Sequence, residues 1–197
     1  MNLPNRLTLF RMVLIPLIVL IYLFPYAQFN IELLNYSFGA VRLSAANLLC
    51  LVLYLIACLT DFLDGRIARA QRLQTTFGKF ADPIANKMLA GALLIMFASK
   101  GIINAVPVII MVCREFVTDG CRIIGAFNGN EVQTQMLDTV MGVSQKVSII
   151  LILLNNLPFE LWQLPLSDIV LWFSAFVSVA GGIAIFNQLK EDILESK

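Results

Sequence analysis

Long apolar runs constrain this chain more than any other feature of its sequence. Six of them cover residues 8–27, 42–60, 80–99, 102–126, 139–157 and 166–188. Most reach the ~20 residues that a helix needs to cross a bilayer. A spanning segment must satisfy its backbone hydrogen bonds internally, because hydrocarbon offers no partners. We therefore predict an all-α, polytopic membrane protein with about six transmembrane helices.

The composition agrees with this class. Hydrophobic residues make up 59% of the 197 residues and charged residues only 14%, which is far less charge than a soluble domain carries. Histidine is absent, so the commonest zinc ligand and the commonest general base are both missing. The sequence has no linker and no internal repeat, so we expect a single domain over 1–197. We expect no nucleic-acid partner. A transporter or channel is disfavoured, because internal repeats or broken helices at corresponding positions would be expected.

Lysine and arginine positions predict the orientation. If the chain crosses the membrane at each apolar run, most basic residues fall on one side, which should be the cytoplasm. These residues are Arg6, Arg11, Arg66, Arg69, Arg72, Lys79, Arg114, Arg122, Lys190 and Lys197. We expect a multi-pass protein of the cell membrane with both termini on the cytoplasmic side.

Two shorter segments complete the expected fold. The stretch from Asn2 to Thr8 predicts a short interfacial helix at the N-terminus, with Asn2 as its cap and Pro4 at an early helical position. Residues 28–42 are polar and aromatic, and we interpret them as an external loop.

Acidic residues cluster around the second and third predicted helices. Asp61 and Asp64 are three residues apart and share one helix face, while Gly78, Asp82 and Asn86 follow one another at intervals of four. Two facing helices would bring three carboxylates and an amide oxygen together. Small side chains continue the first face, at Gly65 and Ala68.

This cluster has the donor chemistry of a divalent-cation site. Carboxylates near a membrane are costly unless they are paired or bind cations. Oxygen donors without histidine or thiolate suit magnesium, manganese or calcium, and two such ions can clamp a phosphate. Arginines that supply positive charge for phosphate oxygens are Arg66, Arg69 and Arg72. For any single aspartate, a salt bridge at a helix end remains an equal alternative, but the spacing of the whole set favours the metal site.

The pattern resembles the motif of the CDP-alcohol phosphotransferase (CDP-alcohol phosphatidyltransferase) family. That motif reads D-x-x-D-G-x-x-A-R, eight residues, then G-x-x-x-D-x-x-x-D. Seven of its eight fixed positions match, namely Asp61, Asp64, Gly65, Ala68, Arg69, Gly78 and Asp82, and the last is Asn86. The opening N-L-P-N-R-L-T-L-F-R and the R-E-F-V-T-D-G-C-R run at 114–122 resemble the branch that makes phosphatidylglycerophosphate.

The resemblance implies a reaction in phospholipid biosynthesis. An acceptor hydroxyl attacks the lipid-side phosphorus of CDP-diacylglycerol, and CMP leaves. For this branch the acceptor is glycerol 3-phosphate. The resemblance further implies two Mg²⁺ or Mn²⁺ ions, a membrane-lipid environment and a homodimer. By the same resemblance the metal positions are Asp61, Asp64, Asp82 and Asn86, the nucleotide positions are Gly65, Ala68, Arg69 and Gly78, and the acceptor-phosphate positions are Arg114 and Arg122.

Two departures from the family pattern weaken the prediction of full activity. Asn86 stands where the family has an aspartate that binds metal and acts as the general base, and an amide cannot accept a proton at neutral pH. Before Gln145, the family's G-K-x-K-T is replaced by Asp138-Thr139-Val140-Met141-Gly142, so both lysines are missing. Either Asn86 is an engineered change in an active enzyme, or the chain is an impaired or inactive member that binds CDP-lipid or pairs with another subunit.

Two local features of the sequence can each be interpreted in two ways. The paired Gly181 and Gly182 in the last predicted helix permit close approach of another helix, either at a dimer interface or within the chain. Arg114 and Arg122 also fit a role as cytoplasmic arginines that set the topology.

Overall fold

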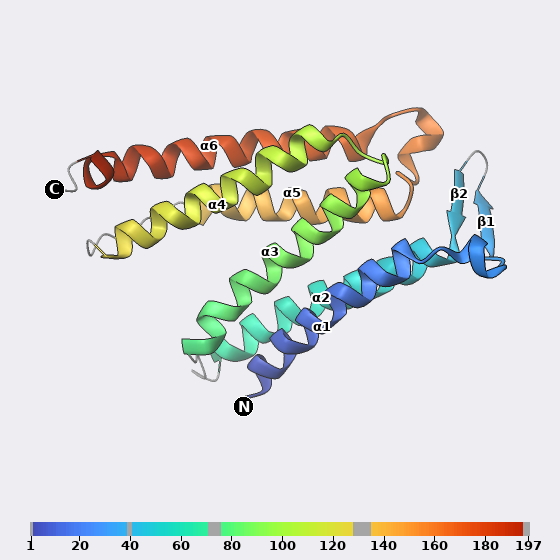
Figure 1. The fold of residues 1–197 in the computed structure, drawn as a ribbon, viewed down its shortest axis with the longest axis horizontal. Helices are drawn as coiled ribbons and strands as arrows, with labels where there is room; N and C mark the ends of the chain where they lie inside the picture. The colour runs from blue at the N-terminus through green and yellow to red at the C-terminus, as the bar shows by residue number, and fades with distance from the viewer. Residues whose placement is uncertain (1, 39–40, 71–75, 128–134, 195–197) are drawn as a thin grey trace. The chain divides into compact units, whose positions relative to one another are not determined.

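The protein is built almost entirely from long helices (Figure 1). The computed structural model describes residues 2–38, 41–70, 76–127 and 135–194. Within these residues the α-helices are α1 (Leu3–Leu23), α2 (Ala45–Ala70), α3 (Thr76–Ser99), α4 (Ala105–Phe127), α5 (Gln135–Leu153) and α6 (Leu166–Leu194). They are the helices predicted from the apolar runs, and the largest difference is at α2, which continues past the predicted end at residue 60 to Ala70.

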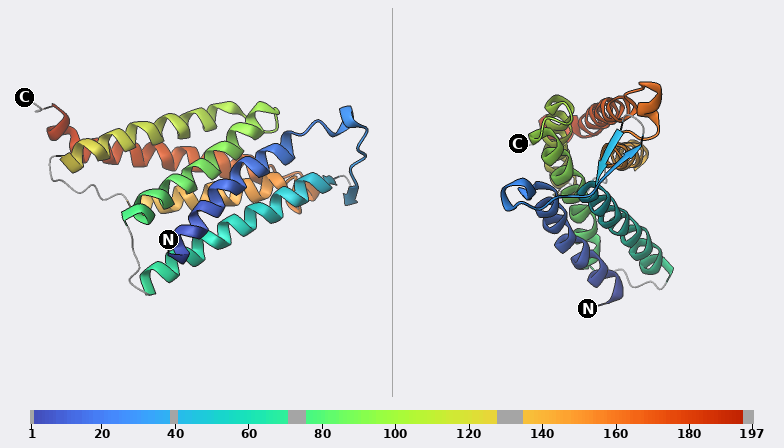
Figure 2. Two further views of the ribbon diagram at one scale, coloured as in Figure 1. Left: turned by 60° about the horizontal axis from the view of Figure 1, so that its bottom comes forward. Right: turned by 90° about the vertical axis from the view of Figure 1, so that its right-hand side faces the viewer.

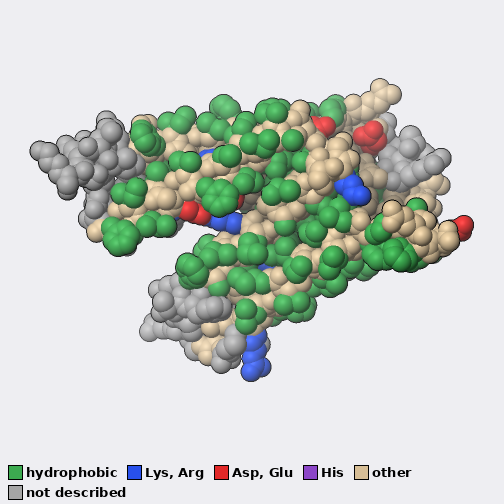
Figure 3. Space-filling model, in the orientation of Figure 1, with side chains coloured by type: hydrophobic (Ala, Val, Ile, Leu, Met, Phe, Trp, Pro, Cys, Tyr) green, Lys and Arg blue, Asp and Glu red, His purple; other side chains and the backbone are tan. Residues whose placement is uncertain are grey.

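The apolar helices confirm an all-α membrane protein. Among the described residues, five helices are long and apolar enough to cross a membrane, over Asn5–Leu23, Ala45–Ile67, Phe80–Ser99, Met136–Leu153 and Leu166–Gln188. Figure 3 shows hydrophobic side chains over much of the visible face, and single side chains such as Leu20 and Phe176 are 67% and 74% exposed. The remaining helix, α4, is of similar length but contains Arg114, Glu115, Asp119 and Arg122.

A short hairpin replaces part of the predicted external loop. Strand β1 (Asn35–Phe38) pairs antiparallel with β2 (Val41–Ser44), with Tyr36 opposite Leu43. The expectation of a loop over 28–42 was therefore wrong for residues 35–38, 41 and 42, and the helix predicted from residue 42 begins three residues later, at Ala45. Ser44 Oγ accepts a hydrogen bond from the backbone N–H of Asn47 at 3.2 Å, so the end of β2 also caps α2. Two 3₁₀ turns complete the connections, η1 (Tyr26–Phe29) and η2 (Phe159–Trp162).

The N-terminus does not form a separate interfacial helix. Helix α1 runs without a break from Leu3 to Leu23, so the predicted short helix is the beginning of the first long helix. Pro4 lies in its first turn, as predicted, where a missing N–H costs nothing. The prediction for Asn2 was wrong in one respect, because its side chain makes no capping hydrogen bond.

Two compact units make up the chain, and each is described by itself. The first unit comprises Met1–Met96 and Ile149–Pro165. In it α1 lies alongside α2, as Figures 1 and 2 both show. Ile18, Cys50 and Tyr54 are fully or almost fully buried, and the Cys50 thiol donates to the Ile18 carbonyl at 3.7 Å.

The second unit comprises Phe97–Ser148 and Leu166–Lys197. Helix α4 packs along α6, and buried hydroxyl groups connect α5 to α6. Ser174 Oγ donates to the Met141 carbonyl at 3.3 Å, and Ser148 Oγ donates to the Ser167 carbonyl at 3.2 Å. These bonds satisfy two of the hydroxyl groups that are buried in this unit.

Candidate active site

Three carboxylates and an amide lie where α2 faces α3 in the first unit. Asp61 and Asp64 come from α2, and Asp82 and Asn86 come from α3. The Asn86 side-chain N–H donates to Asp61 Oδ1 at 2.7 Å. This bond confirms that the two predicted faces meet.

Helix α1 contributes a buried arginine to the same cluster. Arg11 is 0% exposed, and its Nη1 donates to Asp61 Oδ1 at 3.0 Å and to Asn86 Oδ1 at 3.1 Å. Its Nη2 donates to Asp64 Oδ2. One guanidinium thus contacts three of the four predicted metal-site residues.

The fourth predicted metal-site residue also has a partner on α1. Thr8 is 0% exposed, and its hydroxyl donates to Asp82 Oδ1. Because Thr8 and Arg11 are three residues apart, they share one face of α1. That face lies against the carboxylates.

The electrostatics of the cluster favour a cation. The side chain of Asp64 is only 2% exposed and that of Asp61 20%, so water screens them poorly. Among the side chains that the structure describes here, Asp61 and Asp64 accept from one guanidinium, and Asp82 accepts from the uncharged hydroxyl of Thr8. Buried carboxylates in a membrane protein are stabilised by pairing or by a bound cation.

The predicted nucleotide positions lie next to these acids in the chain. Gly65 follows Asp64 on α2, and Gly78 is buried in the first turn of α3. Ala68 and Arg69 belong to the last turns of α2, but their side chains lie outside the described residues. The nucleotide assignment therefore stays a prediction.

In the second unit, the two predicted acceptor-phosphate arginines share one carboxylate. Arg114 Nη2 donates to Asp138 Oδ1 at 2.9 Å, and Arg122 Nη2 donates to Asp138 Oδ2. Asp119 lies 3.9 Å from Arg122. The structure thus brings the two arginines together, around an acid that belongs to one of the departures from the family pattern.

The glycine pair of α6 makes room for Arg114. A Cβ at Gly181 would lie 2.5 Å from Arg114 Nη2, and one at Gly182 would lie 3.2 Å from Arg114 Cγ. The two glycines therefore serve packing within the chain, which was one of the two interpretations of this pair. The side chain of Arg114 is only 9% exposed.

Comparisons with known proteins agree with the motif. A family model described as CDP-alcohol phosphatidyltransferase matches residues 1–180. The chain belongs to this family. A relative from Bacillus subtilis (strain 168), named CDP-diacylglycerol--glycerol-3-phosphate 3-phosphatidyltransferase, is 37% identical over 95% of this chain and 94% of its own length. Relatives of the same name from Rickettsia felis and Pseudomonas fluorescens are 31% and 27% identical, each over 96% of this chain and over 96% and 88% of their own lengths.

Membership of this family implies divalent cations, and the side chains at the four predicted metal positions show whether such ions would fit. Carboxylate and amide oxygens without histidine or thiolate are the ligands that Mg²⁺ and Mn²⁺ prefer. In the described part of the chain, however, no three acidic or cysteine side chains already stand in a metal-binding arrangement. The residues fit the ions by chemistry and charge, and the metal assignment remains a prediction.

Three polar residues of these clusters were missed by sequence reasoning. Arg11 was interpreted only as a topology arginine, Thr8 was given no role, and Asp138 was read as the loss of a family residue. Thr8 and Arg11 lie in the N-terminal stretch that resembles the family, and their spacing of three was an available signal. Nothing in the spacing of Asp138 predicts that it lies between two arginines.

Proposed function

We propose that this protein transfers the phosphatidyl group of CDP-diacylglycerol to glycerol 3-phosphate, which gives phosphatidylglycerophosphate and CMP. The observation that carries this proposal is that Asp61, Asp64 and Asp82, all family-motif positions, are held by one face of α1, through Arg11 and Thr8. Asn86 of α3 also donates to Asp61 of α2. The names of the relatives support the choice of donor and acceptor.

The donor half of the site rests on the acidic cluster. Asp61, Asp64, Asp82 and Asn86 would hold Mg²⁺ or Mn²⁺, two ions by family resemblance. When bound, these ions supply positive charge that stabilises the diphosphate during displacement. Small side chains at Gly65, Ala68 and Gly78 would let the nucleotide approach the backbone, and Arg69 would face its phosphates.

The transfer step requires a group that accepts a proton. The acceptor oxygen forms a bond to the lipid-side phosphorus, the bond from that phosphorus to the CMP oxygen breaks, and the hydroxyl proton must go to a base. Asn86 stands at the family position for this base and cannot accept the proton. Because a positioned base contributes about 10²–10⁴ in rate, we infer that this chain turns over slowly.

The acceptor half of the site rests on two arginines. Arg114 and Arg122 would bind the phosphate of glycerol 3-phosphate through charge-assisted hydrogen bonds. Asp138 accepts hydrogen bonds from both arginines. The acceptor phosphate must therefore either share the two arginines with this carboxylate or displace it from them. Weak acceptor binding follows from this competition.

We also propose the arrangement of the whole protein. The chain forms one catalytic domain over 1–197, assembles as a homodimer and places both termini and the active site on the cytoplasmic side. The distribution of basic residues supports this orientation. Labelling of an Arg6→Cys variant, in a background where the four native cysteines are replaced by serine, tests the topology in sealed vesicles of known orientation. A cysteine that reacts only from the non-cytoplasmic side would contradict it. Cross-linking in detergent tests the dimer, and a protein that stays monomeric would contradict that part.

A non-catalytic role is the second candidate, and a specific observation favours it. The Asn86 side chain donates to Asp61 and accepts from Arg11, so an amide satisfies both neighbours at once. In this role the protein would bind CDP-lipid, or pair with an active subunit, without releasing CMP.

Transfer of labelled acceptor into lipid tests the proposal. Purified protein in detergent receives CDP-diacylglycerol, Mn²⁺ and radiolabelled glycerol 3-phosphate, and the label in the lipid phase is measured. Labelled inositol phosphate serves as the control acceptor. Slow, CDP-diacylglycerol-dependent labelling by glycerol 3-phosphate is expected. Labelling by the control acceptor alone would contradict the choice of acceptor, and CDP-diacylglycerol binding with no transfer would support the second candidate.

A further inference from the structure

Helix α1 holds the acidic cluster through side chains that lie outside the family motif. Arg11 contacts Asp61, Asp64 and Asn86, and Thr8 contacts Asp82. We infer that Thr8 and Arg11 are positioning residues, which orient the carboxylates for the divalent cation. This inference rests on the metal dependence proposed above.

The burial of Arg11 shows how closely it is tied to the acids. A guanidinium with no exposed surface is stable only when carboxylates and acceptors surround it. Its two Nη atoms reach acceptors on both α2 and α3, and its Nε has no hydrogen-bond partner among the described residues. The planar fork of arginine therefore fixes the orientation of Asp61 and Asp64 relative to Asn86.

Thr8 performs the same task for the remaining acid. Its hydroxyl donates to Asp82 from a fully buried position. A hydroxyl adds no charge to the cluster, so its removal changes the orientation of Asp82 and not the electrostatic balance. Valine has the same shape without the donor, and serine keeps the donor on a smaller side chain.

Each contact from α1 uses one oxygen of a carboxylate. Arg11 contacts Asp61 Oδ1 and Asp64 Oδ2, and Thr8 contacts Asp82 Oδ1. A carboxylate has two acceptor oxygens, so a donor at one of them fixes the orientation of the whole group. Partners of this kind support metal ligands, and their loss typically lowers metal affinity about 10–100-fold.

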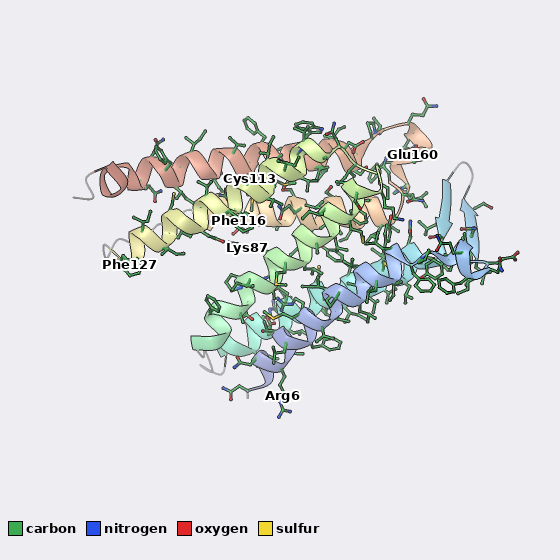
Figure 4. The ribbon with its side chains drawn as sticks, in the orientation of Figure 1. Arg6, Lys87, Cys113, Phe116, Phe127 and Glu160 are labelled. Carbon is green, nitrogen blue, oxygen red and sulfur yellow. The ribbon has the colours of Figure 1, made fainter. Side chains whose placement is uncertain are left out.

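Two pairs of variants separate positioning from general damage. Thr8→Val removes the donor and Thr8→Ser keeps it. Arg11→Lys keeps the positive charge but loses the planar guanidinium with its two Nη donors. Arg6→Lys is the matched control, because it makes the same exchange at an exposed position of the same helix. The Arg6 side chain points away from the neighbouring helices (Figure 4). Binding of Mn²⁺ to the purified full chain is measured by electron paramagnetic resonance of the free ion, and folding is checked by thermal melting in EDTA.

We expect Thr8→Val and Arg11→Lys to weaken Mn²⁺ binding about 10–100-fold, while Thr8→Ser and Arg6→Lys bind as the wild type does. A folded Thr8→Val with wild-type affinity overturns the inference for Thr8. Unchanged or tighter binding by Arg11→Lys overturns it for Arg11, since the arginine would then be neutral or a competitor of the ion. If one variant does not fold, the other decides. A wild-type chain without saturable Mn²⁺ binding would overturn the metal assignment itself, and this inference with it.

Discussion

Replacing Asn86 by aspartate changes one atom that has a defined role in the structure. The amide nitrogen that donates to Asp61 Oδ1 at 2.7 Å becomes a carboxylate oxygen. Two acceptors then face each other across a hydrogen-bonding distance. The second contact of residue 86 changes in the opposite direction, because the oxygen that accepts from Arg11 at 3.1 Å gains negative charge.

The two electrostatic changes oppose each other, so the lost hydrogen bond determines whether the substitution stabilises or destabilises the metal-free protein. Repulsion from Asp61 and attraction to Arg11 act over similar distances and are each about 5 kcal/mol at an effective dielectric constant of ~20. A hydrogen bond to a charged group contributes about 1.5–3 kcal/mol. We therefore expect Asn86→Asp to destabilise the metal-free protein by about 2 kcal/mol, which lowers Tm by about 4–8 °C for a chain of this size.

A divalent cation should reverse this effect. The variant adds a fourth carboxylate to the cluster, so Mn²⁺ is bound more tightly and raises Tm more than it does in the wild type. Melting curves in detergent, in EDTA and across a Mn²⁺ series, measure both changes. Asn104→Asp is the control, because Asn104 is exposed and its side chain acts as an acceptor for the Val106 N–H at 2.8 Å, a role that aspartate keeps. The reasoning is refuted if the variant melts at or above the wild-type temperature in EDTA, or if Mn²⁺ stabilises it no more than the wild type.

Three further predictions concern the acceptor arginines and the metal. Asp138→Asn replaces the carboxylate by an amide, which binds both arginines less strongly, so KM for glycerol 3-phosphate should fall about tenfold or more. An unchanged KM in steady-state kinetics would contradict the proposal that Asp138 competes with the acceptor phosphate for the arginines. Gly181→Ala places a Cβ 2.5 Å from Arg114 Nη2, so the buried guanidinium must move from its bond to Asp138 and both Tm and acceptor affinity should fall. Gly91→Ala, also inside a helix but with nothing within 4 Å, should leave acceptor affinity unchanged and should not lower Tm. EDTA should abolish CMP release, and Mg²⁺ or Mn²⁺ should restore it; release that survives chelation would contradict the metal role.

The helices were predictable because their length and apolarity are properties of short segments. The facing of α2 and α3 was predictable for a related reason. Asp61 and Asp64, and Asp82 and Asn86, lie on helical faces that the spacing alone defines, and the bond from Asn86 to Asp61 joins those faces. A pattern repeated every three or four residues therefore predicts both a helix and the face it turns towards a partner.

Contacts that depend on tertiary packing were not predictable. Arg11 sits in an apolar run, where its charge suggested a membrane boundary, and only the packing of α1 against α2 reveals that it is buried among acids. The acid at 138 stands in place of a family residue, so the sequence suggested a loss of function and not a pairing with Arg114 and Arg122.

The hairpin was missed because its strands are short and polar. Tyr36 and Phe38 alternate with polar residues in β1, and Val41 and Leu43 do so in β2. This alternation of period two was a usable signal for strands. It was outweighed by the polar and aromatic composition of the segment, which is equally typical of an external loop.

The central claim, that this chain carries a phosphatidyltransferase site slowed mainly at position 86, is tested most directly by CMP release. Wild type and Asn86→Asp are compared in detergent with CDP-diacylglycerol, Mn²⁺ and glycerol 3-phosphate, and again without the acceptor. We predict acceptor-dependent release that is slow in the wild type and about 10²–10⁴-fold faster in the variant. If neither protein releases CMP although both bind CDP-diacylglycerol, position 86 is not the main obstacle and the claim is wrong.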